Sequence, residues 1–195
     1  MAMNMDRLTV KSQQAVAQAQ RVAEDRQQPE VQPLHLLAAL MDQEEGIVPA
    51  VLERAGCDRH SLRNRLQELM QEAPHVQGQA QLSASRELRE VLRKAGDAAR
   101  QMQDEYISTE HLLLAVVQQS GPPLSEALKQ AGLSEDVVLQ ALHAVRGTQR
   151  VDDPEPEGKY EAMKKYGTDL TEAARSGRLD PVIGRDSEIR RVVQV

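Results

Sequence analysis

The chain has 195 residues, of which 40% are hydrophobic and only 2% aromatic, with three tyrosines and neither phenylalanine nor tryptophan. This length suffices for one domain of the usual ~100–150 residues plus an appendage, and the apolar content excludes disorder throughout. The scarcity of rings excludes modules that stack bases, and the net charge of −6 disfavours nucleic acid as a partner.

Cysteine usage and the absence of long apolar runs indicate the compartment. Cys57 is the only cysteine, so an internal disulfide and a paired-cysteine zinc motif are both excluded. No stretch reaches the ~18 apolar residues of a membrane span, and the first residues do not form a signal peptide. We therefore expect a soluble, cytoplasmic protein that does not enter a membrane.

An internal duplication organises the chain between about residues 8 and 146. The tripeptide that starts at His35 recurs at His111, 76 residues later, and the helix-ending pair Ala55-Gly56 recurs as Ala131-Gly132 at the same offset. Because several separated segments keep one register without gaps, chance is a poor explanation. The sequence predicts two copies of a small helical unit, about 8–72 and about 82–146.

Each copy is predicted to contain four helices, which makes the fold class all-α. Thr9 and Ser83 are the expected caps of the first helices, and Ser108 caps the second helix of copy two. The second helices cover 33–41 and 109–117, the third 49–55 and 125–131, and the fourth about 60–70 and about 135–145. Gly56 and Gly132 end the third helices.

The composition changes after residue 146. Residues 147–158 are acidic and broken by prolines, which is typical of a mobile linker. A helix over about 160–175, a tight turn and a further helix still in progress at Val195 follow. We expect the chain to be the front of a longer protein.

Motifs for catalysis are absent. The sequence contains no GxSxG, no HExxH and no GxxxxGK[ST] phosphate loop, so neither catalysis, metal binding nor nucleotide hydrolysis is expected of this chain by itself. The repeated His35 and His111 each start an apolar helix and invite a ligand hypothesis. The favoured interpretation is structural, in which each imidazole bonds a neighbouring turn or covers the helix end.

An acidic trio, Asp104, Glu105 and Glu110, flanks the start of the most apolar helix of copy two. These carboxylates either complement the helix dipole or rim an apolar groove that binds a peptide. Copy one lacks the acids at the equivalent positions, so two grooves would be chemically unequal. In the second interpretation, Glu110→Ala should weaken binding of basic peptides more than of neutral ones.

The chain resembles the Clp family of AAA+ ATPases. The two copies, each with a His-Leu-Leu helix and an Ala-Gly stop, are similar to the double repeat at the N-terminus of these proteins. The run LDPVIGRD at 179–186 is similar to the entry of their first AAA+ module. The resemblance implies that 159–195 starts a nucleotide-binding α/β module with Val182 and Ile183 on the adenine side. It implies ATP with Mg as cofactor of the full-length protein and none for the repeats.

Within the family, the opening DRLT at 6–9 and the Lys-Tyr-Gly tail are most similar to the branch of protein disaggregases that act in the stress response. The resemblance implies a mobile domain that engages unfolded or aggregated polypeptide and passes it to a homohexameric motor, with a DnaK-type chaperone system as a further partner. Its implied peptide groove contains Thr9, Asp104 and Glu110, with Leu92 and Leu112 as apolar walls and Tyr106 nearby.

Two alternatives remain open from the sequence. The domain could dock adaptors or substrates for a Clp unfoldase that feeds a peptidase, or it could be a helical scaffold without a groove. A coiled-coil insertion in the downstream sequence would favour disaggregation, and a peptidase-docking loop would favour proteolysis.

Overall fold

The computed structural model describes residues 5–43, 46–76, 82–147 and 149–156, together with residues 175, 177 and 191. The chain divides into two units, Met1–Tyr160 and Glu161–Val195, and the fold below is that of the first. The predicted start of an AAA+ module, 159–195, lies outside the described residues except for residues 175, 177 and 191. Val182 and Ile183, predicted to lie beside the adenine, are among the residues that are not described.

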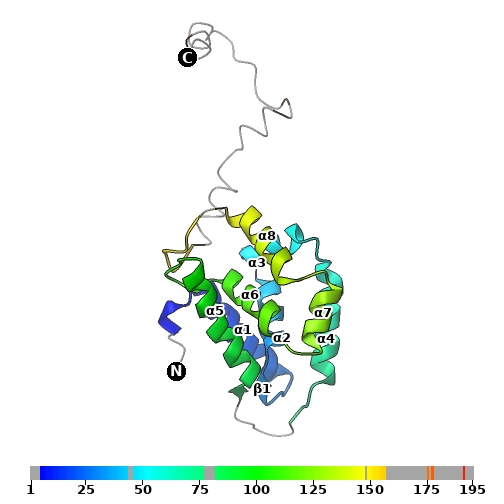
Figure 1. Ribbon diagram of the computed structural model, residues 1–195. Helices are drawn as coiled ribbons and strands as arrows, with labels where there is room; N and C mark the ends of the chain where they lie inside the picture. Colours follow the sequence, from blue (N-terminus) through cyan, green and yellow to red (C-terminus); the bar gives the residue numbers. More distant parts are fainter. Residues whose placement is uncertain are drawn as a thin grey trace. The chain divides into compact units, whose positions relative to one another are not determined.

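The first unit is built from helices, which confirms the all-α prediction (Figure 1). The elements in chain order are η1 (Met5–Arg7), α1 (Val10–Asp25), β1 (Glu30–Val31), α2 (Pro33–Asp42), α3 (Ile47–Arg54), α4 (Arg59–Glu72), β2 (Ser83–Ala84), α5 (Arg86–Gln101), α6 (Thr109–Gln119), α7 (Leu124–Gln130) and α8 (Glu135–Arg146). Within the described part, no helix is long and apolar enough to cross a membrane.

Helix starts follow the capping residues, with one correction. Thr9 caps α1, as predicted, and its Oγ1 accepts the Ser12 N–H at 3.2 Å. In copy two the cap of α5 is Ser85, whose Oγ accepts the Leu88 N–H at 3.0 Å. The prediction of Ser83 was wrong because Ser83 belongs to β2, where it pairs with Glu30. Ser85 is the residue that the repeat offset places opposite Thr9.

The third helices begin slightly earlier than predicted and end one residue earlier, with Ala55 and Ala131 as their C-cap residues. The first starts at Ile47 because Pro49 fits within the first turn, where a backbone N–H has no helical partner. Gly56 and Gly132 follow the ends of α3 and α7 with φ of 73° and 75°, a conformation that other residues rarely adopt.

Two parallel bridges, not predicted from the sequence, tie the copies together. Val31 pairs with Ala84 in the β1–β2 pair, and Leu8 pairs with Ile107. The repeat offset relates Leu8 to Ala84 and Val31 to Ile107, so the second bridge is the pseudo-symmetric image of the first. Each copy therefore pairs the segment before its first helix with the segment before the second helix of the other copy.

The core is aliphatic, as the composition predicts. Helices α2 and α6 contact each other and most of the remaining helices (Figure 1). Their fully buried leucines are Leu36, Leu37, Leu40, Leu112 and Leu113. Contacts of α3 with α8 and of α4 with α7 close the domain across the two copies.

Residues 149–156 differ from the expected mobile linker. Val151 is completely buried against copy two, and the carbonyl of Pro154 accepts the Val10 N–H at 2.9 Å. The acidic, proline-rich composition predicted mobility because composition does not reveal that one apolar residue, Val151, is buried. In its described part this segment is packed against the repeat domain.

Candidate functional site: an apolar pocket and a buried ion cluster

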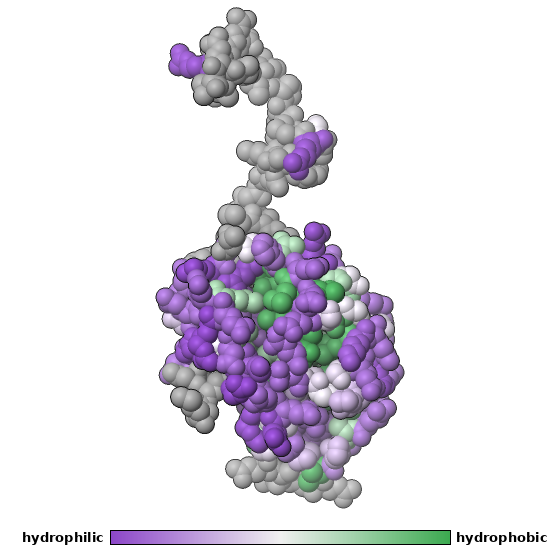
Figure 2. Space-filling view, viewed as in Figure 1, coloured by the Kyte–Doolittle hydropathy of each residue, from purple (hydrophilic) through white to green (hydrophobic). Residues whose placement is uncertain are grey.

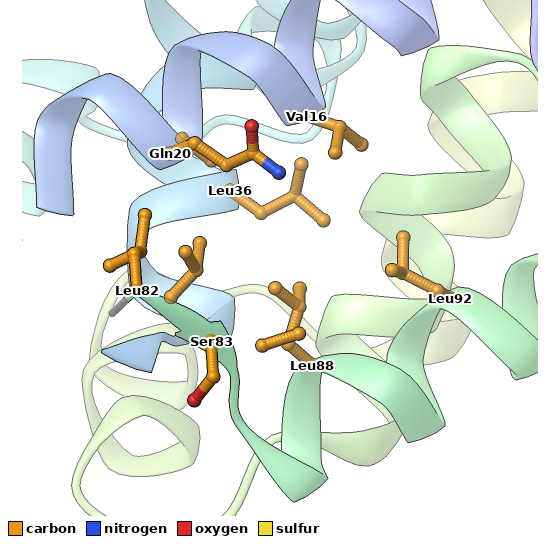
Figure 3. Close-up of a pocket in the computed structure, with 10 residues that line it drawn as sticks. Val16, Gln20, Leu36, Leu82, Ser83, Leu88 and Leu92 are labelled. Atoms are coloured by element: carbon orange, nitrogen blue, oxygen red, sulfur yellow. The ribbon is translucent and has the colours of Figure 1, made fainter. Parts of the chain in front are cut away.

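An apolar pocket of about 180 Å3 opens between α1, α5 and the β1–β2 pair (Figure 3). We call it the α1–α5 pocket. Its lining carries no charged side chain and consists of Val16, Ala19, Gln20, Val31, Leu36, Leu82, Ser83, Ala84, Leu88 and Leu92. A protein cavity of about 150 Å3 holds a benzene-sized molecule. The α1–α5 pocket therefore has room for a branched aliphatic side chain.

The pocket forms where the two copies differ in side-chain size. On this side the bridge residues are Val31 and Ala84, whereas the pseudo-symmetric bridge uses the larger Ile107 and Leu8. The Cδ1 atom of Ile107 lies 3.5 Å from the position that a Cβ on Gly96 would take. On the other side of the domain, Ile107 thus packs close to α5, at the position where the α1–α5 pocket has the smaller Val31.

The pocket is reached from solvent through partly exposed side chains. Leu82, Ala84 and Leu92 are half-buried, and Gln20 is exposed at the α1 side. In Figure 3, Val16 and Leu36 lie across from Leu88 and Leu92. An incoming apolar group would cover these side chains and remove their remaining surface from water, which is the main source of binding energy available here.

Apolar residues also reach the surface elsewhere in the repeat domain. Figure 2 shows them gathered over the middle of one face, surrounded by hydrophilic residues. Within the described residues, Val145 is the large hydrophobic residue classed as exposed, at 36%. The apolar surface is therefore contributed mostly by partly buried residues, as in the α1–α5 pocket.

Of the six residues expected to bind peptide, the α1–α5 pocket contains only Leu92. Leu112 is completely buried in the core, and Tyr106 is half-buried outside the pocket. Thr9 is also completely buried, and its hydroxyl both caps α1 and donates to Ser12 Oγ at 3.0 Å. The structure does not bring these residues together around one open groove.

Asp104 and Glu110 are exposed by only 5% and 1%, so they do not rim an open groove in this structure. Instead they face Arg146 at the end of α8. Arg146 forms an ion pair with Asp104 Oδ1, and its Nη1 lies 3.6 Å from Glu110 Oε1. The sequence did not reveal this partner because copy one has a methionine, Met70, at the position equivalent to Arg146.

Asp104 is the centre of this buried cluster. Its Oδ2 accepts from His111 Nε2 at 2.9 Å, and its Oδ1 accepts the Val151 N–H at 2.8 Å. Burial alone would raise the pKa of Asp104, but the hydrogen bonds from His111, Arg146 and Val151 outweigh it and hold that pKa well below its usual range. Asp104 is therefore ionised in the folded domain at neutral pH.

The two repeated histidines are structural, which confirms the favoured interpretation. The Nδ1 atom of His35 accepts the Gln32 N–H at 2.9 Å, and Nδ1 of His111 accepts the Ser108 N–H at 3.0 Å. Each imidazole thus covers the start of its own helix, and Nε2 carries the proton. Burial, with the charge of Arg26, lowers the pKa of His35 to about 4.

In the described part of the chain, no group of three or more His, Cys, Asp or Glu side chains is arranged to hold a metal ion. The chemistry that the site offers is therefore apolar contact in the α1–α5 pocket and hydrogen bonding around Asp104.

Residues 7–131 match the model of the Clp repeat N-terminal domain family. The chain belongs to this family. The chain is also similar to curated relatives along its whole length. It is 40% identical over 195 residues to the chaperone protein ClpB of Rhodopirellula baltica and 42% identical over 198 residues to that of Nitratidesulfovibrio vulgaris. These alignments cover 100% and 99% of this chain but only 22% and 23% of the relatives.

Solved structures show the same fold. The Hsp104 N-terminal domain from Candida albicans superposes with a TM-score of 0.69 at 22% identity, covering 77% of this chain and 98% of that one. A ClpV N-domain in complex with a VipB peptide superposes with a TM-score of 0.52 at 19% identity, covering 87% and 94%. The chain is thus similar in sequence to ClpB chaperones over less than a quarter of their length, and its repeat domain shares the fold of Clp-type N-domains.

Proposed function

We propose that the Clp repeat domain engages exposed apolar segments of unfolded or aggregated polypeptide, and that it does so in the α1–α5 pocket. The observation that carries this proposal is an uncharged aliphatic pocket, open to solvent, between α1 and α5. The relatives support it, since the curated proteins named above are ClpB chaperones and one structural neighbour is a ClpV N-domain in complex with a VipB peptide.

The pocket favours weak and unspecific capture. Burial of apolar surface yields about 25 cal/mol per Å2, and the ordering of both partners offsets much of that gain. No charged group in the lining selects a particular sequence. Such a surface suits a domain that must hold many different chains briefly and release each one.

For the full-length protein we propose an ATP-dependent disaggregase. In this proposal 1–146 is the substrate-engaging domain and 159–195 begins the first AAA+ module, with Val182 and Ile183 beside the adenine of ATP-Mg. The protein would act as a cytoplasmic homohexamer together with a DnaK-type system. The ATPase activity would belong to the AAA+ modules and not to the repeats.

The test is to narrow the α1–α5 pocket with a larger side chain at Ala84, which lines it. Ala84→Leu places at β2 the leucine that Leu8 supplies on the other side. Titration of a permanently unfolded protein into the labelled chain should shift the NMR signals of Val16, Leu88 and Leu92. We expect Ala84→Leu to weaken this binding at least tenfold.

Ala144→Leu is the matched control, because Ala144 is exposed on α8 and distant in sequence from every lining residue. It should bind as the wild type does. Unaltered binding by Ala84→Leu, with both variants folded by circular dichroism, would show that capture does not use this pocket.

A further inference from the structure

The segment 150–156, which we call the docked segment, lies on copy two in the manner of a bound peptide. The Val151 N–H donates to Asp104 Oδ1 at 2.8 Å, and its carbonyl accepts the N–H groups of Glu105 and Tyr106 at 3.0 and 3.3 Å. Its side chain is completely buried. Copy two thus satisfies the whole backbone of this residue and encloses its side chain.

Further contacts anchor the docked segment on both sides of Val151. The guanidinium of Arg150 donates to Gln103 Oε1 at 2.5 Å. The carbonyl of Pro154 accepts the N–H of Val10, the first residue of α1, at 2.9 Å, and this N–H belongs to the helix turn that has no partner within its own helix. Pro156 is buried as well.

The groups that receive the docked segment also make contacts within the repeat domain. Asp104 is oriented by His111 and Arg146, and the next residues lead directly into the bridge between Ile107 and Leu8. A site with its polar groups already oriented does not need its ligand in order to form. Because most of these bonds go to the backbone, the site demands only a small aliphatic side chain at one position.

Copy one lacks such a site for a physical reason. The residue equivalent to Asp104 is Gln28, whose Oε1 lies 2.5 Å from His35 Nε2 and whose Nε2 donates to the Met70 carbonyl at 2.6 Å. The amide oxygen of Gln28 is thus bonded to His35, and its amide nitrogen is bonded to Met70. The carboxylate of Asp104 has additional lone pairs, and one of them accepts the incoming N–H of Val151.

We propose that the docked segment is a tethered ligand of a second peptide-binding site, formed by Asp104, Glu105, Tyr106 and Val10. When the segment leaves, the same groups bind an extended stretch of another polypeptide through its main chain, with a valine-like residue in the socket. This site is separate from the α1–α5 pocket and does not depend on the function proposed for that pocket. A short tether gives the segment an effective concentration in the millimolar range, so a free peptide competes poorly while the tether is docked.

The experiment uses the whole 195-residue chain and a fluorescent peptide with the sequence of residues 149–156, QRVDDPEP. Val151→Asp should undock the segment, because its carboxylate would be completely buried next to the ionised Asp104. Val145→Asp is the matched control, since Val145 is exposed on α8. We expect the peptide to bind Val151→Asp at least tenfold more tightly than it binds the wild type or the control, by fluorescence anisotropy.

Hydrogen exchange supplies a readout at the site itself. The amides of Glu105 and Tyr106 should exchange faster in Val151→Asp and slow again when the peptide is added, whereas a peptide with aspartate in place of valine should not slow them. Equal affinity for all three proteins would overturn the proposal, since the segment would then not occlude the site. Absence of binding to Val151→Asp would overturn it as well. Ala84→Leu in the Val151→Asp background should leave this binding unchanged, and a loss there would mean that the peptide uses the α1–α5 pocket instead.

Discussion

His35 shows how a residue repeated for structural reasons makes stability depend on pH. The pKa of a histidine in an unfolded chain is about 6.5, and burial lowers that of His35 to about 4 in the folded domain. Between these values the unfolded state binds more protons, so protonation favours unfolding. The stabilisation by neutral His35 is complete above pH ~6.5 and is lost as the pH falls towards ~4, at a cost of up to roughly 3 kcal/mol.

We therefore predict that His35→Asn flattens the dependence of the unfolding free energy on pH between about 4 and about 6.5. Urea denaturation at a series of pH values measures this dependence. His60→Asn is the control because His60 is exposed, and it should leave the profile as it is in the wild type. A His35→Asn profile as steep as that of the wild type would contradict the assignment.

The Asp104–Arg146 pair yields a second prediction at this scale. Asp104→Gln removes the carboxylate that forms an ion pair with the buried Arg146, and we expect a loss of about 3 kcal/mol in unfolding free energy. Copy one shows an arrangement that works without charges, in which Gln28, Met70 and Leu34 occupy the positions of Asp104, Arg146 and Glu110. The triple change Asp104→Gln, Arg146→Met and Glu110→Leu should therefore recover more than half of the loss in urea denaturation. Additive losses would argue that the three residues do not form a unit.

The residue scale also marks the limit of prediction from sequence. Thr9 and the two histidines were interpreted correctly as helix-start residues, because capping depends on neighbours three or four positions away. Asp104 and Glu110 were candidates either for complementing the helix dipole or for the rim of a groove, and they are instead buried beside Arg146, which lies 42 and 36 residues away and is a methionine in copy one. A charge pair between distant helices leaves no local pattern in the sequence.

At the scale of elements, the N-cap of α5 can be tested, because the structure assigns it to Ser85 and the sequence-based prediction was Ser83. Ser85→Ala removes the hydroxyl that accepts the Leu88 N–H, and we expect a loss of about 1 kcal/mol in unfolding free energy. Ser83→Ala changes an exposed residue of β2 and should stay within about 0.5 kcal/mol of the wild type. Thermal or urea denaturation of the two variants compares them directly, and a larger loss for Ser83→Ala would place the cap where the sequence alone suggested.

The helices could be predicted because the repeat offset and the apolar periodicity act over ten or more residues. The strands could not, since β1 and β2 are two residues long and show no alternation. Their pairing depends on residues that the fold brings together from opposite copies. For the same reason the α1–α5 pocket could not be predicted, because its lining combines side chains of α1, α5 and both short strands.

At the scale of the whole molecule, the location of the charges predicts how capture responds to salt. The lining of the α1–α5 pocket is uncharged, and Glu110 is buried beside Arg146. Affinity for a neutral apolar peptide should therefore change less than about twofold between about 0.1 and about 1 M salt, although the screening length falls from about 10 to about 3 Å. Glu110→Ala should affect basic and neutral peptides alike, contrary to the expectation of an acidic rim. If Glu110→Ala weakened the binding of basic peptides selectively, as measured by fluorescence anisotropy, the interpretation of Glu110 as part of an acidic rim would be supported instead.

The two bridges have a consequence for the origin of this architecture. In Leu8–Ile107 and Val31–Ala84, each copy completes the other and neither pairs these segments within itself. A single copy standing alone could make the same pairs only with a second molecule of its own kind, arranged about a two-fold axis. The domain is in effect a homodimer whose subunits have been fused into one polypeptide. Fusion allowed the halves to diverge, so that one bridge carries Val31 and Ala84 while the other carries Leu8 and Ile107, an asymmetry that identical subunits cannot have.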